Sequence, residues 1–272
     1  MGSLLAATAS YLDAKSRKGD WLVRIDDVDT ARSVPGAAEQ ILRTLEAHGL
    51  QWDDKVDYQT EHLDKYQAAV ETLAGRKLIF YCRCSRRSLS RMGVYPGKCR
   101  DNVELQQDAA IRIRVDEARI TFTDLIQGRQ LEHLAETVGD FIIRRRDGLI
   151  AYQLATAVDD GDPRITHVAR GSDLLSNTSR QLYLMALLDL SPPIYAHVPT
   201  LVDANGKKLS KQSHAPPVDA SRPAANLLSV FGYLGLKPPG DPYSWNPDTL
   251  LAWGCENWSL QRLTGRSTVS VV

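Results

Sequence analysis

Segments that favour β-strands alternate along this chain with segments that favour helices. Residues 21–27 (WLVRIDD) have the pattern of a short buried strand that ends in carboxylates. A helix follows, with Pro35 near its first turn and Gly49 just past its end. Residues 165–171 (ITHVARG) again favour a strand, and a helix over about 178–188 comes next. Such alternation is typical of α/β folds with a parallel sheet.

Two regions depart from this alternation. Residues 82–130 contain a loop with three cysteines and two alternating strand-like stretches, which predicts a small β-rich insertion. Residues 141–152 (FIIRRRDGLIAY) predict two strands joined at Asp147-Gly148, with Tyr152 in the second strand. The first helix is expected over 4–14 with Ser3 as its N-cap, and the tail after Pro216 is expected to be mainly helical.

Composition excludes several classes of protein. No apolar run approaches the roughly 18 residues that a membrane helix needs, and no signal sequence opens the chain. Four cysteines in 272 residues are too few for a disulfide scaffold, so we expect a reducing, cytoplasmic setting. Lysine plus arginine equals aspartate plus glutamate, at 33 each, so net charge gives no support to a nucleic-acid partner.

The most specific local pattern is Cys82-x-Cys84 followed by Tyr95 and Cys99. Thiolates at this spacing can converge on one tetrahedral ion, and zinc is the usual choice of sulfur-rich sites. The alternative is three free cysteines in a loop, and the spacing does not decide between Tyr95 and water as a fourth ligand. Core packing is the better explanation for Cys255.

The loop around these cysteines is basic. It contains six positive residues and no acidic one between 82 and 100, namely Arg83, Arg86, Arg87, Arg91, Lys98 and Arg100. Two interpretations stay open. The run is either a solvated face or a rigid patch for a phosphate backbone.

Three further groups of residues suit a polar ligand. Lysines at 207, 208 and 211 follow a strand and an Asn205-Gly206 turn, where they could neutralise the β- and γ-phosphates of a nucleotide. Asp26, Asp27 and Asp29 crowd a strand end and could hold an ammonium group or a metal, or merely cap the next helix. Arg170 ends another strand and could grip a carboxylate in bidentate fashion.

Taken in order, five segments resemble class I aminoacyl-tRNA synthetases of the glutamyl type: GSLLAA from Gly2, VRIDDVDTARSVPGAAEQIL from Val23, AYQLATAVDD from Ala151, ITHVARGSDLL from Ile165 and KLSKQ from Lys208. Within that family, the short paralogues carry the CxC…YxxxC zinc pattern, have His-Ala-Pro after KLSKQ, and lack an anticodon-binding domain. The resemblance covers nearly the whole chain.

The resemblance implies a Rossmann-type parallel sheet with a zinc-binding insertion and a helical C-terminal part. The expected ranges are 1–81 and 131–215 for the two halves of the catalytic domain, 82–130 for the insertion and 216–272 for the helical region. It implies a monomeric ligase that activates glutamate with ATP and Mg²⁺. The glutamyl group would then pass to queuosine at the wobble position of tRNA(Asp).

The resemblance also implies roles for individual residues, all numbered in this chain. Lys208 and Lys211 would act in catalysis, with Lys211, Gly2 and Ser3 contacting ATP. Asp26, Tyr152 and Arg170 would bind glutamate, Asp26 through its ammonium and Arg170 through a carboxylate. Cys82, Cys84, Tyr95 and Cys99 would hold one structural Zn²⁺.

The chain departs from the family pattern in two places. Asp26 stands where the family usually has glutamate, which predicts weaker glutamate binding because the side chain is one methylene shorter. The family also begins with a strand carrying RFAPSPTG, ahead of the position of Met1. Without it we expect a sheet that lacks a central strand and little ATP–pyrophosphate exchange. Two alternatives remain, a fragment of a discriminating glutamyl-tRNA synthetase and an inactive zinc-bearing RNA-binding protein.

Overall fold

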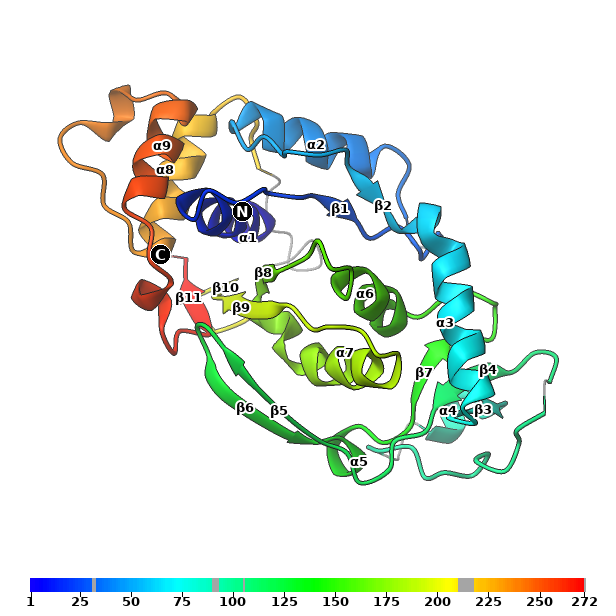
Figure 1. Ribbon diagram of the computed structural model, residues 1–272. Coiled ribbons are helices and arrows are strands. Elements are labelled where there is room, and N and C mark those ends of the chain that lie inside the picture. Colours follow the sequence, from blue (N-terminus) through cyan, green and yellow to red (C-terminus); the bar gives the residue numbers. More distant parts are fainter. Residues whose placement is uncertain (31–32, 90–92, 105, 210–217, 272) are drawn as a thin grey trace.

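The computed structural model describes residues 1–30, 33–89, 93–104, 106–209 and 218–271 (Figure 1). The α-helices of these residues are α1 (Gly2–Ser16), α2 (Ala37–Ala47), α3 (Leu63–Gly75), α4 (Arg86–Leu89), α5 (Leu134–Thr137), α6 (Tyr152–Asp160), α7 (Leu175–Leu187), α8 (Pro223–Leu234) and α9 (Pro247–Glu256). The short 3₁₀ turns are η1 (Gln59–His62), η2 (Ser172–Leu174), η4 (Pro242–Ser244) and η5 (Leu260–Leu263).

The strands form parallel pairs and two antiparallel sheets. The parallel pairs are β1 (Arg24–Ile25) with β2 (Asp57–Tyr58), β8 (His167–Gly171) with β9 (Ile194–Val198), and β10 (Thr200–Val202) with β11 (Thr268–Ser270). The antiparallel sheets are β3 (Ile79–Cys82), β4 (Ala110–Ile113) and β7 (Phe141–Arg144) in the order β3-β4-β7, and the hairpin β5 (Arg119–Asp124) with β6 (Gly128–His133). The α/β class with parallel strands is confirmed. Among the described strands, however, β1 and β8 are not bonded to each other, so the parallel strands do not form one continuous sheet.

The first helix packs its apolar side against the C-terminal helices. Leu5, Ala9 and Leu12 of α1 are buried in the core that this helix shares with α8 and α9. Figure 1 shows α1 beside α8 and α9 at its left, and α1 also contacts β8. The helix starts at Gly2, with Met1 as N-cap and Leu5 N–H donating to the Met1 carbonyl. The prediction of Ser3 as the N-cap is therefore wrong, because the first turn already includes it.

The second helix is only partly buried. It begins after Gly36, which adopts the left-handed conformation at φ +77°, so Pro35 lies just before the first turn, near it as predicted. Leu45 is buried, but Ile41 is 52% exposed. Gly49, at φ +73°, does follow the end of the helix as predicted.

A second hydrophobic core lies between the antiparallel sheet and helices α3, α6 and α7. Tyr66 and Leu73 of α3 are buried there against β3, β4 and β7, while Leu63 at the start of α3 is 48% exposed. The predicted hairpin at Asp147-Gly148 exists as a turn, but its second strand is reduced to a single bridge between Arg144 and Ile150. The chain then enters α6 directly.

The C-terminal region contains α8 and α9, as expected, and closes on a strand that was not expected. Residues 268–270 form β11, which lies parallel to β10. Cys255 of α9 packs against the core around α1, which confirms its structural interpretation. Residue 82 ends β3 and residue 130 falls within β6.

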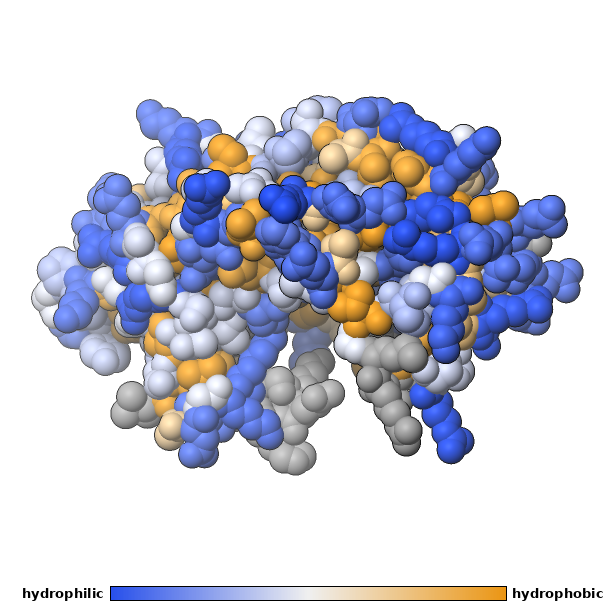
Figure 2. Space-filling model, turned by 90° about the horizontal axis from the view of Figure 1, so that it is seen from below, coloured by the Kyte–Doolittle hydropathy of each residue, from blue (hydrophilic) through white to orange (hydrophobic). Residues whose placement is uncertain are grey.

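The surface is mainly hydrophilic on the side shown in Figure 2, with small and separate hydrophobic patches. Within the described part of the chain, no helix is both long enough and apolar enough to cross a membrane.

Candidate functional site

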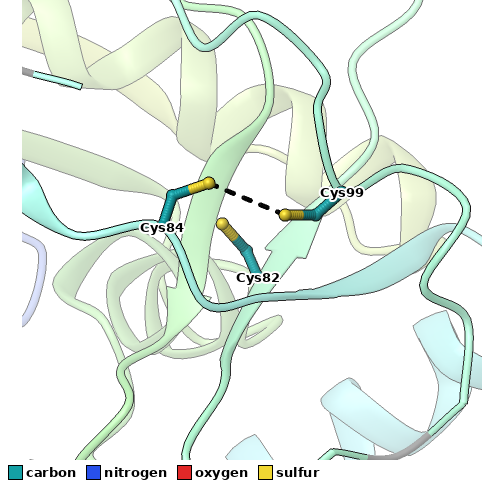
Figure 3. Close-up of side chains that lie close together, drawn as sticks. All are labelled: Cys82, Cys84 and Cys99. Carbon is teal, nitrogen blue, oxygen red and sulfur yellow. Dashed lines mark hydrogen bonds between the residues drawn. The ribbon is translucent and has the colours of Figure 1, made fainter. Parts of the chain in front are cut away.

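Three cysteines from one end of the antiparallel sheet point toward one another (Figure 3). Cys82 is the last residue of β3 and is buried, Cys84 follows it, and Cys99 comes from the next loop. Their sulfur atoms all lie within 4.8 Å of one another, and the Sγ atoms of Cys84 and Cys99 are 3.6 Å apart. A tetrahedral ion with Zn–S bonds of about 2.3 Å separates its sulfur ligands by roughly 3.8 Å. The spacing therefore suits a zinc ion.

The hydroxyl of Tyr95 lies next to the three cysteines. Its Oη accepts a hydrogen bond from Cys99 N–H at 3.0 Å and lies 3.5 Å from Cys82 Sγ. Its ring stacks on Phe80, and the guanidinium of Arg112 lies 4.0 Å above it. Burial raises the pKa of the Cys82 thiol, but hydrogen bonds from Tyr95 and Arg112 outweigh it and lower that pKa to about 7. A thiol that ionises readily is suited to bind metal.

The basic loop is only partly a free cationic surface. Arg100 bonds to both carboxylate oxygens of the buried Asp140, at 2.6 and 2.7 Å, and Arg83 donates to the backbone carbonyl of Gln107. These two arginines therefore hold the loop in place. Lys98 is exposed. Arg91 and the side chain of Arg86 lie outside the described residues.

The three carboxylates after β1 have different partners. Asp26 accepts a hydrogen bond from Arg24 Nε at 2.7 Å, and its side chain is 39% exposed. Asp27 accepts from the backbone N–H and hydroxyl of Thr60, and Asp29 is paired with Arg145. Asp27 and Asp29 thus hold neighbouring loops. Asp26 remains the most available of the three for a ligand.

An ion pair connects the first residue of β1 with the last residue of α6. Arg24 Nη1 lies 2.7 Å from Asp160 Oδ1, and the side chain of Asp160 is 3% exposed. Burial raises the pKa of Asp160 above its ordinary value in spite of this pair. The other oxygen of Asp160 is 3.7 Å from Arg170 Nη1 and has no hydrogen-bond partner among the described residues. Asp160 therefore lies between two arginines.

Arg170 is nearly the last residue of β8 and is almost completely buried. Its Nη2 donates to Thr178 Oγ1 at 2.8 Å and to Gln181 Oε1 at 2.6 Å, while its Nε bonds to His197 Nε2 at 3.1 Å. Among the described residues, Nη1 makes no hydrogen bond. The sequence-predicted arginine is thus fixed through Nε and Nη2, while Nη1 faces Asp160 Oδ2 at 3.7 Å.

The other predicted ligand residues are distributed as follows. Tyr152 is the first residue of α6 and not part of a strand, because the hairpin ends at Ile150. Lys208 pairs with Asp173 of η2, directly after β8, and is therefore close to the end of the strand that carries Arg170. Gly2 and Ser3 lie in the first turn of α1. Lys211 lies outside the described residues, as do Gln212 and the His-Ala-Pro segment.

The pattern of the sequence suggests either a turn or a polar site for Asp160, but sequence reasoning missed three other residues that build this site, namely Arg24, Asp124 and His197. Asp124 and His197 are fully buried, and Asp124 Oδ2 is 2.6 Å from His197 Nδ1. The available signal was the presence of charged or titratable side chains inside otherwise apolar strands, where they need partners.

Comparison with known proteins agrees with this architecture. Residues 1–223 match the family model described as the catalytic domain of class I tRNA synthetases (E and Q). The chain belongs to the class I tRNA synthetases. Members of this family are ligases that use ATP and Mg²⁺. This synthetase is 47% identical over 269 residues to the Glutamyl-Q tRNA(Asp) synthetase of Pseudomonas aeruginosa, covering 98% of this chain and 92% of the relative. The protein of that name from Ectopseudomonas mendocina is 45% identical over 270 residues, covering 99% and 92%.

Solved structures share the fold of this synthetase. A glutamate-tRNA synthetase from Elizabethkingia anophelis superposes with a TM-score of 0.80 at 22% identity, covering all of this chain and 65% of the other. A glutamate tRNA ligase from Elizabethkingia meningosepticum gives 0.79 at 23% identity, with 99% and 64% covered. The chain therefore spans somewhat less than two thirds of these solved proteins.

Proposed function

We propose that this synthetase activates glutamate with ATP and transfers it to queuosine in tRNA(Asp). The observation that carries the proposal is the buried guanidinium of Arg170, which is held through Nε and Nη2 while Nη1 makes no hydrogen bond among the described residues, in a chain nearly half identical to proteins named Glutamyl-Q tRNA(Asp) synthetase. The narrower choice of acceptor rests on that name. A discriminating glutamyl-tRNA synthetase has no separate observation in its favour.

In the proposed complex, Nη1 of Arg170, which lies 3.7 Å from Asp160 Oδ2, binds a carboxylate of glutamate. A buried guanidinium binds a carboxylate strongly because both charges are shielded from water. Asp26 would accept from the ammonium group, helped by its partial exposure and by Arg24, which fixes one of its oxygens. Tyr152, at the start of α6, would line the same site. Asp26 is one methylene shorter than the glutamate residue that the family usually has at this position. Its contact with the ammonium group of the substrate is therefore expected to be weaker.

Activation joins the bound glutamate to the nucleotide. The α-carboxylate attacks the α-phosphorus of ATP, the bond to the β-phosphate breaks, and pyrophosphate leaves with its electron pair. Lys208 and Lys211, together with Mg²⁺, would neutralise the charge that develops on the phosphates. Gly2 and Ser3 would contact ATP. Lys208 supports this role by its position, because it is tethered to Asp173 beside the end of β8.

We also propose that Cys82, Cys84, Tyr95 and Cys99 bind one structural zinc ion. The separation of the sulfur atoms and the place of the Tyr95 hydroxyl support the proposal. When bound, the ion would crosslink two loops at the end of β3. Its contribution would be to rigidify this end of the protein, remote in sequence from Arg170 and Lys208.

The test is acceptor identity. The protein translated from its complete reading frame is incubated with radiolabelled glutamate, ATP, Mg²⁺ and either queuosine-containing tRNA(Asp) or the same tRNA without queuosine. We expect label only on the modified tRNA, and a cytoplasmic, monomeric enzyme. Transfer to tRNA(Glu) instead would favour the discriminating synthetase. Zinc-dependent tRNA binding without pyrophosphate exchange would favour an inactive RNA-binding protein.

A further inference from the structure

Arg170 is oriented by two buried side chains, the first of which comes from outside the parallel strands. Asp124, the last residue of β5, lies against His197 of β9, and His197 in turn lies against Arg170 of β8. The side chains of Asp124 and His197 have no exposed surface. The β5–β6 hairpin is therefore connected to the proposed glutamate ligand through a single imidazole.

The hydrogen bonds of Asp124 determine which nitrogen of His197 carries the proton. The carboxylate accepts from the backbone N–H groups of Ile126, Gln127 and His197, at 2.8–3.2 Å. Burial raises the pKa of Asp124, but its bond with His197 and those backbone bonds outweigh this and lower the pKa below its ordinary value. An ionised carboxylate only accepts hydrogen bonds, so His197 Nδ1 must be the donor in the 2.6 Å contact.

With its proton on Nδ1, neutral His197 presents a lone pair on Nε2. That atom lies 3.1 Å from Arg170 Nε, which always carries a proton and can only donate. Thr178 Oγ1 is also 3.1 Å from Nε2 and accepts from Arg170 Nη2, so it closes the arrangement. The guanidinium is thereby held in one plane, with Nη1 facing Asp160.

We propose that Asp124 and His197 are positioning residues that hold Arg170 in its carboxylate-binding orientation, and that protonation of His197 releases it. A proton on Nε2 would face the N–H of Arg170 at 3.1 Å, with two donors and two positive charges opposed. Glutamate affinity should then fall in mild acid. This inference rests on the proposed role of Arg170 in binding glutamate.

The surroundings of His197 favour the neutral form at ordinary pH. The titratable groups that face it are Asp124 from β5, Arg170 from β8, Asp173 from η2 and Tyr195, its stacked neighbour on β9. Burial lowers the pKa of His197 most strongly and the charge of Arg170 lowers it further, against the opposing effect of the two carboxylates. The net direction is downward, so release would occur below the usual range of histidine.

The pair itself is tested by NMR, without substrate. In full-length protein labelled with ¹⁵N in histidine, His197 should show a proton on Nδ1 and none on Nε2 at neutral pH. In Asp124→Asn the amide can donate to Nδ1, so the tautomer should change to Nε2–H. Equal tautomers in the two proteins, or an Nε2–H tautomer in the wild type, would overturn the proposal.

The positioning role of Asp124 and His197 is tested by the affinity for glutamate, measured calorimetrically between about pH 5 and pH 8. Wild type should weaken on the order of tenfold toward the acid end, as expected for one lost hydrogen bond to a charged group. His197→Gln keeps an acceptor for Arg170 but does not titrate, so its affinity should vary little with pH. The matched control His167→Gln, an exposed histidine at the start of β8, should behave as wild type.

These two measurements separate the two proposals. If Arg170→Lys binds glutamate as tightly as wild type, the role proposed for Arg170 fails, while the NMR result still decides the pair. If glutamate binding depends on Arg170 but His197→Gln keeps the pH dependence of wild type, the positioning role is overturned and the proposed function stands.

Discussion

Arg24 and Asp160 lie 136 residues apart in the chain and form an ion pair of 2.7 Å between Nη1 and Oδ1. The pair connects the start of β1 to the end of α6, two elements that are not joined by backbone hydrogen bonds in the described structure. Arg24 also bonds to Asp26, so it couples the most available carboxylate of the site to its buried frame.

This pair should matter for stability more than surface pairs do. Arg24→Ala leaves Asp160 buried with only Arg170, at 3.7 Å, as a partner, and should cost about 3–5 kcal/mol of unfolding free energy. The control is Arg164→Ala, whose arginine is 61% exposed beside Asp162 and should change stability by less than about 1 kcal/mol. Urea unfolding measures both. Equal losses in the two variants would show that the buried pair has no special weight.

The element types that depend on periodicity could be predicted from sequence, while their lengths often could not. Residues 21–27 favour a strand, yet only Arg24 and Ile25 are in one, because a strand is defined by its partner and β2 offers just two residues. The alternating pattern before Tyr152 predicts a strand that includes this residue. In the structure, the chain after the turn at Gly148 forms only a single bridge before α6 begins at Tyr152. Tertiary pairing, which no local pattern contains, made the difference.

In the site, too, some residues could be predicted from local sequence and others could not. Arg170 and the cysteine cluster could be predicted, because a strand-end arginine and close cysteine spacing are local signals. Asp124 and His197 could not, because their chemistry arises from contact between residues 73 apart. Nothing near either residue in the sequence indicates that one fixes the tautomer of the other.

The cysteine cluster should bind one zinc ion per chain. Cys84→Ser removes one of three converging sulfur ligands, so its zinc content after dialysis should fall well below that of wild type. Cys255→Ser, in α9 and outside the cluster, should keep its zinc. Elemental analysis gives the content. A chelator should lower the melting temperature of wild type by several degrees and leave that of Cys84→Ser unchanged. Equal zinc in both cysteine variants would contradict this site.

Gly139 should be essential for the packing of the cysteine loop. It adopts φ +64°, and an added Cβ would clash with Val94 Cγ1 and lie 3.4 Å from the backbone nitrogen of Tyr95. Gly128→Ala is the matched control, since φ is +72° there but no atom lies within 4 Å. Both variants should lose about 1–2 kcal/mol from backbone strain. Gly139→Ala should lose about 1–3 kcal/mol more from overpacking, and equal losses in urea unfolding would exclude the clash.

Acid should destabilise the protein partly through His197. Histidine in an unfolded chain titrates near pH 6.5. Because burial lowers the pKa of folded His197, the unfolded state binds more protons between the two pKa values, and stability falls as pH drops through that window.

The lowered pKa of Asp124 adds stability that is present above about pH 3.9 and is lost as pH falls through its folded pKa. His197→Gln removes the first contribution and, because the bond with His197 helps to lower the pKa of Asp124, also reduces the second, which changes with pH only below about pH 3.9. Its unfolding free energy should therefore decline less than that of wild type between pH 6.5 and the folded pKa of His197, when both are measured by urea unfolding at several pH values. Every other histidine is common to the two proteins, so the difference between the curves isolates His197, and parallel curves would show that its pKa is the same in both states.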